Sequence, residues 1–438
     1  MRIYGKISLP GDKSIAHRSI ILSVISRGKT AIYNLPGNQD CLSTIRALRK
    51  LGASISKKKY NKVIISGQGI YGLTRPKMPV FIGESGTTFR LLLGVLAGQP
   101  FKVTLAAGSS LSRRPMRRVT EPLRKMGATI NSKLKKSPPG AGPPTAEKIE
   151  EFPPITISGG ALKGITYKMP VASAQVKSAI LLAGLFAEGK TIVIEGVPTR
   201  DHTERMLRLF GAAVNPKGHR ISLTGGRELK SPGKIYIPGD ISSASFFIAG
   251  ALILPGSHLI IKDISLNPTR MGIIKVLKRM GADIKLTKQA KGYEPVGDLV
   301  IKSSDLKATT VEKTEIPSLI DELPILMVAS CFADGETRFC GVEELRVKET
   351  DRIKSMADNL RKMRANIKVI KSGKQVCISV KGGRGLKAAQ VESFGDHRTA
   401  MSMVIAGLGA TGKTKVSGLS CIAKSFPGFQ SVLKSIIR

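Results

Sequence analysis

The sequence is poor in aromatic and in acidic residues. It has no Trp, 7 Tyr and 13 Phe, and its 31 Asp and Glu face 70 Lys and Arg, which gives a formal net charge of +39. A field of this sign attracts polyanions without selecting one, and either a general bias toward lysine or nucleic-acid binding would produce it. Because basic residues do not alternate with aromatic side chains that could stack on bases, we favour the bias and expect no specific nucleic-acid partner.

Long apolar runs and paired cysteines are also missing. The longest runs, such as SAILLAGLFA, are too short to span a bilayer, and the N-terminus lacks the apolar core of a signal peptide. The five cysteines show no CxxC spacing, so we expect thiols in a reducing compartment and neither disulfides nor a zinc site. Together these absences predict a cytoplasmic protein that does not enter a membrane. Its 438 residues can bury a large core and predict two domains.

One helix-to-strand segment recurs along the chain at intervals of roughly 70 to 84 residues. Its copies are LRKLGASI from Leu48, LRKMGATI from Leu123, LRLFGAAV from Leu207, LKRMGADI from Leu277 and LRKMRANI from Leu360. In each copy an amphipathic helix ends at a glycine, or at Arg364, and small and β-branched residues then begin a strand. The last residues of the sequence, SVLKSIIR, are interpreted as a sixth copy that contains the helix but not the strand that follows it.

A second, more apolar helix type alternates with the first. Each of its copies is closed by a glycine, namely Gly28, Gly98, Gly189, Gly256, Gly335 and Gly412. Six helices of each type, interleaved with strands, predict an α/β fold of six β-α-β-α-β-β units. Because the last copy lacks strands, the N-terminal MRIYGKISLPG should complete it. The prediction is a continuous domain at 14–238 and a discontinuous one at 1–13 plus 239–438, each of three units, with ligands bound in a cleft between them.

One segment interrupts this pattern. Residues 133–154 are rich in proline and glycine with mixed charge. This composition predicts an exposed, poorly ordered excursion between two units. We assign it no chemistry.

Three predicted helix starts combine glycine with nearby cations. They are GDKSIAHR at 11–18, GESGTTFR at 83–90 and GDHRTAM at 395–401. Glycine allows close backbone approach, and the free N–H groups and dipole of a helix N-terminus attract anions. In the first start Ser14 should be the N-cap, so Lys13 and Arg18 add positive charge to an end that is already positive. Each start alone also fits an ordinary capped helix, but their recurrence favours bound anions.

Two further clusters of charged residues can each be interpreted in two ways. In ELRVKETDR a helix would place Lys348 and Arg352 on one face beside Glu349, although a solvated helix with local ion pairs fits as well. In SLIDELP the carboxylates of Asp321 and Glu322 stand in an apolar context. A carboxylate there is either a base with a raised pKa or a helix cap.

The chain resembles the 3-phosphoshikimate 1-carboxyvinyltransferase family, also called the 5-enolpyruvylshikimate-3-phosphate synthases. The matching segments are PGDKSIAHR, SGTTFR, RRPM, SAQVKSA, RDHTE, IDELP, RVKETDR, FGDHRTAM and AKSFPGF, in this order over nearly the whole length. The resemblance implies a two-domain inside-out α/β barrel with three units per domain. It also implies transfer of the enolpyruvyl group of phosphoenolpyruvate to the 5-hydroxyl of shikimate 3-phosphate, without a metal or organic cofactor. We expect a monomer.

The resemblance further implies roles for residues in the matching motifs. Asp321 would accept the proton of the 5-hydroxyl, while Lys13 and Glu349 would transfer the proton at C3 of phosphoenolpyruvate. Shikimate 3-phosphate would be bound by Lys13, Ser14, Arg18, Ser173, Ala174, Gln175, Thr199, Arg200, Asp321 and Lys348. Phosphoenolpyruvate would be bound by Lys13, Gly86, Arg114, Gln175, Arg352, Arg398 and Lys424, with Arg90 and His397 nearby. His17 would be a structural neighbour.

Some positions depart from the family pattern. Ala174 stands where part of the family has serine, Glu84 and Ser85 precede Gly86 where Asn-Ala or Asn-Ser is common, and Leu91 replaces a frequent proline. Gly86 implies room for the inhibitor glyphosate. The sister enolpyruvyl transferases that act on UDP-N-acetylglucosamine usually carry a cysteine in the loop before an Arg-Pro pair. The corresponding GSSLSRRPM has none, which disfavours that alternative.

Overall fold

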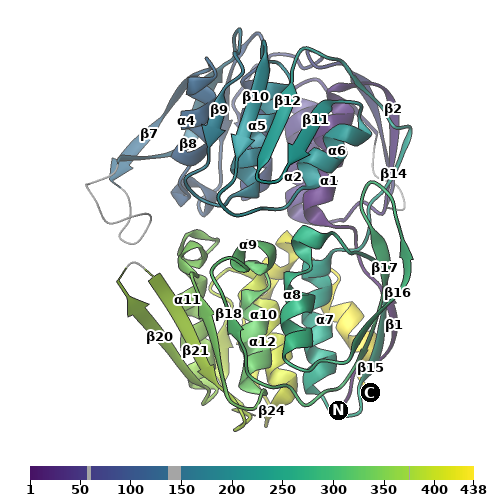
Figure 1. Cartoon of the computed structure of the whole chain (residues 1–438), viewed down its shortest axis with the longest axis vertical. Coiled ribbons are helices and arrows are strands. Elements are labelled where there is room, and N and C mark those ends of the chain that lie inside the picture. The colour runs from purple at the N-terminus through teal and green to yellow at the C-terminus, as the bar shows by residue number, and fades with distance from the viewer. Residues whose placement is uncertain (57–60, 137–148, 374) are drawn as a thin grey trace. The chain divides into compact units, whose positions relative to one another are not determined.

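The computed structural model describes residues 1–56, 61–136, 149–373 and 375–438, which form two compact units (Figure 1). The first unit contains Met1–Asp12 and Pro238–Arg438, and the second contains the described residues from Lys13 to Ile237. Both units mix helices with strands, so the predicted α/β class is correct. Within the described ranges, no helix combines the length and the apolar character needed to cross a membrane.

Three apolar helices form the centre of the second unit. They are α1 (Lys13–Val24), α3 (Gly86–Leu96) and α5 (Ala174–Gly184), and nearly all of their residues are buried. A helix that is apolar on all sides must be covered on all sides, which explains their central position. The more polar helices are α2 (Gln39–Lys50), α4 (Arg117–Lys125) and α6 (His202–Leu209), with the short 3-10 helix η1 at Leu111–Arg113.

The described strands of the second unit form three mixed sheets. The first contains β2 (Ser26–Tyr33), β3 (Ser54–Ile55), β4 (Val63–Gln68), β13 (Leu229–Lys230) and β14 (Lys234–Tyr236). The second contains β5 (Val80–Phe81), β6 (Lys102–Ala106), β7 (Thr129–Lys136) and β8 (Ile149–Ser158). The third contains β9 (Thr166–Lys168), β10 (Lys190–Ile194), β11 (Ala213–Lys217) and β12 (Arg220–Thr224). In the orders β13-β2-β4-β3, β5-β6-β8-β7 and β9-β10-β12-β11, one parallel pairing precedes two antiparallel ones.

The first unit also has three apolar helices at its centre. These are α7 (Ile241–Ile253), α10 (Leu323–Cys331) and α12 (His397–Gly409), which pack against one another (Figure 1). Around them lie α8 (Gly272–Arg279), α9 (Ile316–Leu319), α11 (Arg352–Lys362) and α13 (Phe429–Ile436). Its 3-10 helices are η2 (Pro268–Arg270), η3 (Glu343–Val347) and η4 (Leu419–Lys424).

Two four-stranded sheets in the first unit repeat the same pairing pattern. One has the order β1-β15-β17-β16, with β1 at Tyr4–Ser8, β15 at His258–Ser265, β16 at Ile284–Ala290 and β17 at Val296–Lys302. The other has the order β18-β19-β21-β20, with β18 at Thr310–Val311, β19 at Glu336–Cys340, β20 at Asn366–Ser372 and β21 at Gln375–Lys381. Two short parallel pairs join β22 (Leu386–Lys387) to β24 (Ala410–Thr411) and β23 (Gln390–Glu392) to β25 (Lys415–Ser417).

The two ends of the chain lie together in the first unit. Strand β1 pairs in parallel with β15, Ile3 bridges Ile437, and the backbones of Arg2 and Arg438 exchange two hydrogen bonds of 2.9 Å. The N-terminal strand therefore neighbours the C-terminal helix α13, as the shortened last copy of the repeated segment predicted.

The residues predicted to end the repeated helices have the backbone conformation that this role requires. Gly52, Gly127, Gly211 and Gly281 have φ values from 83° to 113°, and Arg364 has a φ of 64°. A positive φ after the last helical turn directs the chain into the following strand, and glycine adopts it without a steric penalty. Arg364 adopts the same conformation despite its Cβ, at a cost of roughly 1–2 kcal/mol.

Two local predictions about helix starts were wrong. Helix α1 begins at Lys13, so Ser14 lies inside its first turn and is not the N-cap. Helix α11 begins at Arg352 after its N-cap Asp351, so Lys348 and Glu349 precede the helix and do not share a face with Arg352. In the second case Asp351 accepts hydrogen bonds from the amides of Ile353 and Lys354, which places the helix start there.

The prediction of a poorly ordered segment at 133–154 was wrong at both of its ends. Lys133–Lys136 and residues 149–154 belong to β7 and β8, which pair with each other in antiparallel fashion. Pairing with the opposite strand, and not local composition, extends both strands into this segment. Residues 137–148 lie outside the described residues.

The prediction that all five cysteines are thiols was also wrong. Cys340 of β19 and Cys377 of β21 stand directly opposite each other, with their Cα atoms 4.2 Å apart, and form a disulfide. The antiparallel register brings them together across 37 residues of sequence, which no local spacing could reveal. Cys41, Cys331 and Cys421 are buried and do not take part in a disulfide.

Candidate functional site

Many of the candidate residues lie at or near helix N-termini. In the second unit they occupy the starts of α1, α3 and α5, and in the first unit they precede or begin α10, α11 and α12. Each of these helices is long enough to carry a positive N-terminal potential, and its first amides have no carbonyl partner within the helix. Both units therefore present helix ends suited to anions.

Arg18 is held rigidly at the start of α1. It is 4% exposed, and its Nε donates to Thr203 Oγ1 at 2.6 Å while its Nη2 donates to Ser178 Oγ at 2.6 Å. Its Nη1 also donates to the carbonyl of Ser14 at 2.9 Å. These acceptors are neutral, so the side chain is oriented while its positive charge is not cancelled by them. Such a guanidinium suits an anionic group such as a phosphate.

Arg90 and Gln175 join the starts of α3 and α5. Arg90 Nη1 donates to Gln175 Oε1 at 2.5 Å, and Gln175 Nε2 donates to Thr87 Oγ1 at 2.9 Å. Gly86 faces a second cation, because a Cβ added there would lie 2.6 Å from Arg114 Nη1. The absence of a side chain at Gly86 thus lets an arginine approach the first turn of α3.

Lys13, at the start of α1, forms an ion pair with Asp40. Its Nζ lies 2.8 Å from Asp40 Oδ2, and both side chains are mostly buried. His17, four residues later, is fully buried with Nδ1 2.6 Å from Thr44 Oγ1. This position agrees with a structural role for His17.

Thr199 lies in a buried network built around Lys177. Thr199 donates through both its amide and its hydroxyl to Glu195, at 3.0 and 2.5 Å. Lys177 Nζ contacts Glu195 at 3.0 Å and Glu204 at 2.7 Å, and all three charged side chains are at most 4% exposed. Burial is the largest effect on Glu204 and raises its pKa, although Lys177 opposes the shift. The network orients the loop that carries Thr199 and Arg200.

In the first unit Arg352 is surrounded by carboxylates. Its Nε donates to Asp396 at 2.7 Å, its Nη2 to Glu349 at 2.6 Å and its Nη1 to Asp321 at 3.3 Å. Burial alone would lower the pKa of Arg352, but the charges of Asp396, Glu349 and Asp321 raise it above its usual range. The guanidinium therefore stays charged and fixes two of the three predicted catalytic groups.

Arg398 holds the same carboxylate from another side. Its Nη1 donates to the carbonyl of Asp321 at 3.1 Å, and its Nη2 lies 3.6 Å from Asp321 Oδ2. His397 is 2% exposed beside it, and Lys424 at the end of η4 donates to the carbonyl of Gly395 at 3.1 Å. Lys348 lies between η3 and α11 and is partly exposed.

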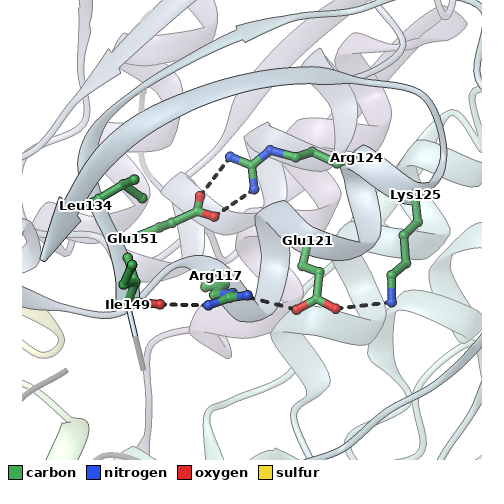
Figure 2. Close-up of a pocket in the computed structure, with 7 residues that line it drawn as sticks. All are labelled: Arg117, Glu121, Arg124, Lys125, Leu134, Ile149 and Glu151. Carbon is green, nitrogen blue, oxygen red and sulfur yellow. Dashed lines mark hydrogen bonds and ion pairs between the residues drawn. The ribbon is translucent and has the colours of Figure 1, made fainter. Parts of the chain in front are cut away.

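A separate pocket lies beside α4, β7 and β8 in the second unit (Figure 2). It has a volume of about 380 Å³ and is lined by Arg117, Glu121, Arg124, Lys125, Leu134, Ile149 and Glu151. Arg124 donates to both carboxylate oxygens of Glu151. Burial alone would raise the pKa of Glu151, but hydrogen bonds from Arg124, Thr120 and Ser132 lower it. This lining includes none of the residues that the sequence predicts for substrate binding.

Several supporting residues were missed from the sequence although they lie within or beside its motifs. Ser178 is the last serine of SAQVKSA, Thr203 belongs to RDHTE and Asp396 belongs to FGDHRTAM. Each bonds an arginine that is 44 to 185 residues away. Their position inside these motifs was a sequence signal from which they could have been identified. Asp40, the partner of Lys13, has no such signal.

Comparison with known proteins gives a consistent result. The family model for EPSP synthase (3-phosphoshikimate 1-carboxyvinyltransferase) matches residues 1–433. The 3-phosphoshikimate 1-carboxyvinyltransferase of Desulforamulus reducens is 44% identical over 437 residues, which cover 100% of this chain and 97% of the relative. That of Geobacter sp. is 47% identical with the same coverage. The solved structure of EPSP synthase from Acinetobacter baumannii has a TM-score of 0.84 and 43% identity, and covers 99% of this chain and 96% of its own.

Proposed function

The chain belongs to the EPSP synthase family, and we propose on this premise that it transfers the enolpyruvyl group of phosphoenolpyruvate to the 5-hydroxyl of shikimate 3-phosphate. The products are 5-enolpyruvylshikimate 3-phosphate and inorganic phosphate. The observation that carries the proposal is the set of buried arginines at helix N-termini, namely Arg18, Arg90, Arg352 and Arg398. Both substrates are multiply anionic, and guanidinium groups bind phosphate and carboxylate in a bidentate manner.

The proposed reaction requires two proton transfers and one elimination. The 5-hydroxyl oxygen attacks C2 of phosphoenolpyruvate as it loses its proton to Asp321, and C3 gains a proton from the pair Lys13 and Glu349. The tetrahedral intermediate then breaks its C–O bond to phosphate and loses a proton from C3. Arg352 supports these roles because it contacts both Asp321 and Glu349, which orients the two carboxylates.

Substrate binding is proposed residue by residue. Shikimate 3-phosphate would contact Lys13, Ser14, Arg18, Ser173, Ala174, Gln175, Arg200, Asp321 and Lys348, with Thr199 orienting the loop of Arg200 through Glu195. Phosphoenolpyruvate would contact Lys13, Gly86, Arg114, Gln175, Arg352, Arg398 and Lys424, with Arg90 and His397 beside them. Ala174 offers no hydroxyl, so its contribution would come from its backbone. Each unit would thus supply part of the substrate-binding residues.

We also infer that the fold is built from six β-α-β-α-β-β units, three in each domain of an inside-out α/β barrel. The support is that five sheets share one order of pairings, in which a parallel pair is followed by two antiparallel ones. The short pairs β22–β24 and β23–β25 with helix α13 would belong to the remaining unit. A monomeric state and a cytoplasmic location remain predictions of the sequence.

The test is phosphate release by purified protein supplied with both substrates. We expect turnover by the wild type, and losses of at least about a hundredfold in kcat for Asp321→Ala and Lys13→Ala. Lys354→Ala and Asp358→Ala are matched controls, because these residues form an exposed ion pair on α11, and they should keep normal activity. Absence of wild-type turnover, or turnover only with UDP-N-acetylglucosamine as acceptor, would refute the proposal.

A further inference from the structure

Besides Arg352 and Arg398, the first unit contains a further buried arginine that lies outside the predicted substrate-binding residues. Arg270, the last residue of η2, is 2% exposed. Its Nη2 donates to Ser242 Oγ at 2.5 Å and lies 3.4 Å from Asp240, 3.7 Å from Glu322 and 3.8 Å from Asp12. The guanidinium of Arg270 thus lies within ion-pair distance of three carboxylates, which come from three separate parts of the chain.

The backbone that carries Arg270 is itself fixed. Asn267 caps η2 by accepting from the amide and hydroxyl of Thr269, and its Nδ2 donates to the buried Glu294 at 2.8 Å. Asn267 is fully buried and Glu294 is 2% exposed. A short helix anchored in this way presents its last side chain from a constant position.

The network continues from Arg270 to the predicted proton acceptor. Glu322 is fully buried and accepts from Ser242 Oγ, and its Oε1 lies 3.9 Å from Arg398 Nη1. That same Nη1 donates to the carbonyl of Asp321, the residue before Glu322. Arg270 therefore acts on Asp321 through two routes, the chain itself and Arg398.

Several features of the network around Arg270 reduce its contribution to the stability of the fold. Arg270 Nε and Glu322 Oε2 are buried, and neither has a hydrogen-bond partner among the described residues. Burial and the neighbouring charge of Asp12 raise the pKa of Asp240 to about 6. Buried ion pairs with unmatched atoms usually contribute less to stability than apolar residues of the same volume would. Stability alone therefore does not account for a buried cation at this position.

We propose that Arg270 is a positioning residue for the reaction, which holds Glu322 and thereby sets the placement and the electrostatic environment of Asp321. This inference rests on the proposed function. The charged groups that face the network are Asp12, Asp240, Arg398 and Arg352 in addition to Glu322. Arg270 does not itself need to touch a substrate for this role.

The experiment compares Arg270→Gln and Arg270→Lys with the wild type by measuring kcat, both KM values and the pH dependence of kcat. Arg270→Gln should lower kcat by at least about tenfold, since small displacements of a reacting group have large effects on rate. It should also move the acid limb of the profile to higher pH, because a cation coupled to Asp321 is removed. Arg270→Lys keeps the charge and should return the acid limb toward its wild-type position.

Arg124→Gln is the matched control, because it removes an arginine from the buried carboxylate of Glu151 in the other unit. It should lower the free energy of unfolding and leave the kinetics unchanged. If Arg270→Gln does not fold, Glu322→Gln removes the same link with an isosteric side chain. It should lower kcat in the same way but move the acid limb to lower pH, because it removes an anion near Asp321. An active wild type whose Arg270 or Glu322 variant keeps its kcat and acid limb would overturn this inference alone. An inactive wild type would instead refute the proposed function.

Discussion

Nη2 of Arg352 lies 2.6 Å from Oε2 of Glu349, three residues earlier in the chain. The same guanidinium bonds Asp396 through Nε and Asp321 through Nη1, so one planar group orients three carboxylates. The guanidinium spreads its donors over three nitrogens in one plane, whereas the three donors of a lysine ammonium all leave a single nitrogen. The relationship makes Arg352 the organiser of the candidate residues in the first unit.

Arg352→Lys should therefore lower kcat/KM by at least about a hundredfold, which corresponds to roughly 3 kcal/mol of transition-state stabilisation. The charge is kept, but the hydrogen bonds to Asp321, Glu349 and Asp396 cannot all be made. Steady-state kinetics with both substrates measure the effect. Arg361→Lys, on the exposed side of the same helix, should behave like the wild type. A loss of less than threefold would contradict the role assigned to Arg352.

Gly86→Ala should raise the KM for phosphoenolpyruvate and weaken inhibition by glyphosate. The added Cβ would stand 2.6 Å from Arg114 Nη1, which is closer than nonbonded atoms approach, so the arginine must move. Gly160→Ala is the matched control in the same unit, because a Cβ there meets nothing within 4 Å. Glyphosate titrations of the two variants measure the effect. Equal inhibition of Gly86→Ala and the wild type would show that the position does not border the inhibitor.

Asp240→Asn should change how stability depends on pH. Burial and the charge of Asp12 raise the pKa of Asp240 from 3.8 to about 6, so the folded state binds its proton more tightly than the unfolded state does. The contribution of this carboxyl to stability therefore becomes less favourable as the pH rises from about 4 to about 6. Urea unfolding across this range should give a difference, wild type minus variant, that decreases with pH. A constant difference would rule out this titration.

Lys177→Met should destabilise the second unit. The substitution leaves Glu195 and Glu204 buried without their cation. Removing one partner of a buried ion pair lowers the free energy of unfolding by about 3–5 kcal/mol. Lys354→Met, which removes one partner of an exposed ion pair, should change the free energy of unfolding by at most about 1 kcal/mol. Urea unfolding of both variants tests the contrast, and equal effects would contradict it.

Thiol counting should distinguish the cysteines. In denaturant without reductant, three thiols should react with a chromogenic disulfide reagent, and after reduction five should react, because Cys340 and Cys377 form a disulfide. In the native protein Cys331 should be inert, since burial raises the pKa of its thiol to about 12. Five reactive thiols in unreduced, denatured protein would show that the disulfide is absent.

Local patterns in the sequence were enough to place most elements and most candidate residues. The repeated LRKxGA-type segments predicted helices that end at residues with positive φ, and these occur at Gly52, Gly127, Gly211, Gly281 and Arg364. Helix starts that combine glycine with cations predicted anion sites at α1, α3 and α12. These features depend on a few neighbouring residues, so short-range rules describe them. The ends of β7 and β8 within 133–154 were misread because the proline and glycine content of that segment outweighed a pairing between the two strands that composition does not show.

The sequence by itself determined the element types, the repetition and the family to which the chain belongs. Only the tertiary structure decided which side chains meet. Arg18 reaches Ser178 and Thr203, Arg270 gathers Asp12, Asp240 and Glu322, and Cys340 meets Cys377. These contacts depend on strand register and helix packing, which place residues together whatever their distance along the chain. Local patterns do not encode such contacts, because burial and charge act between neighbours in space.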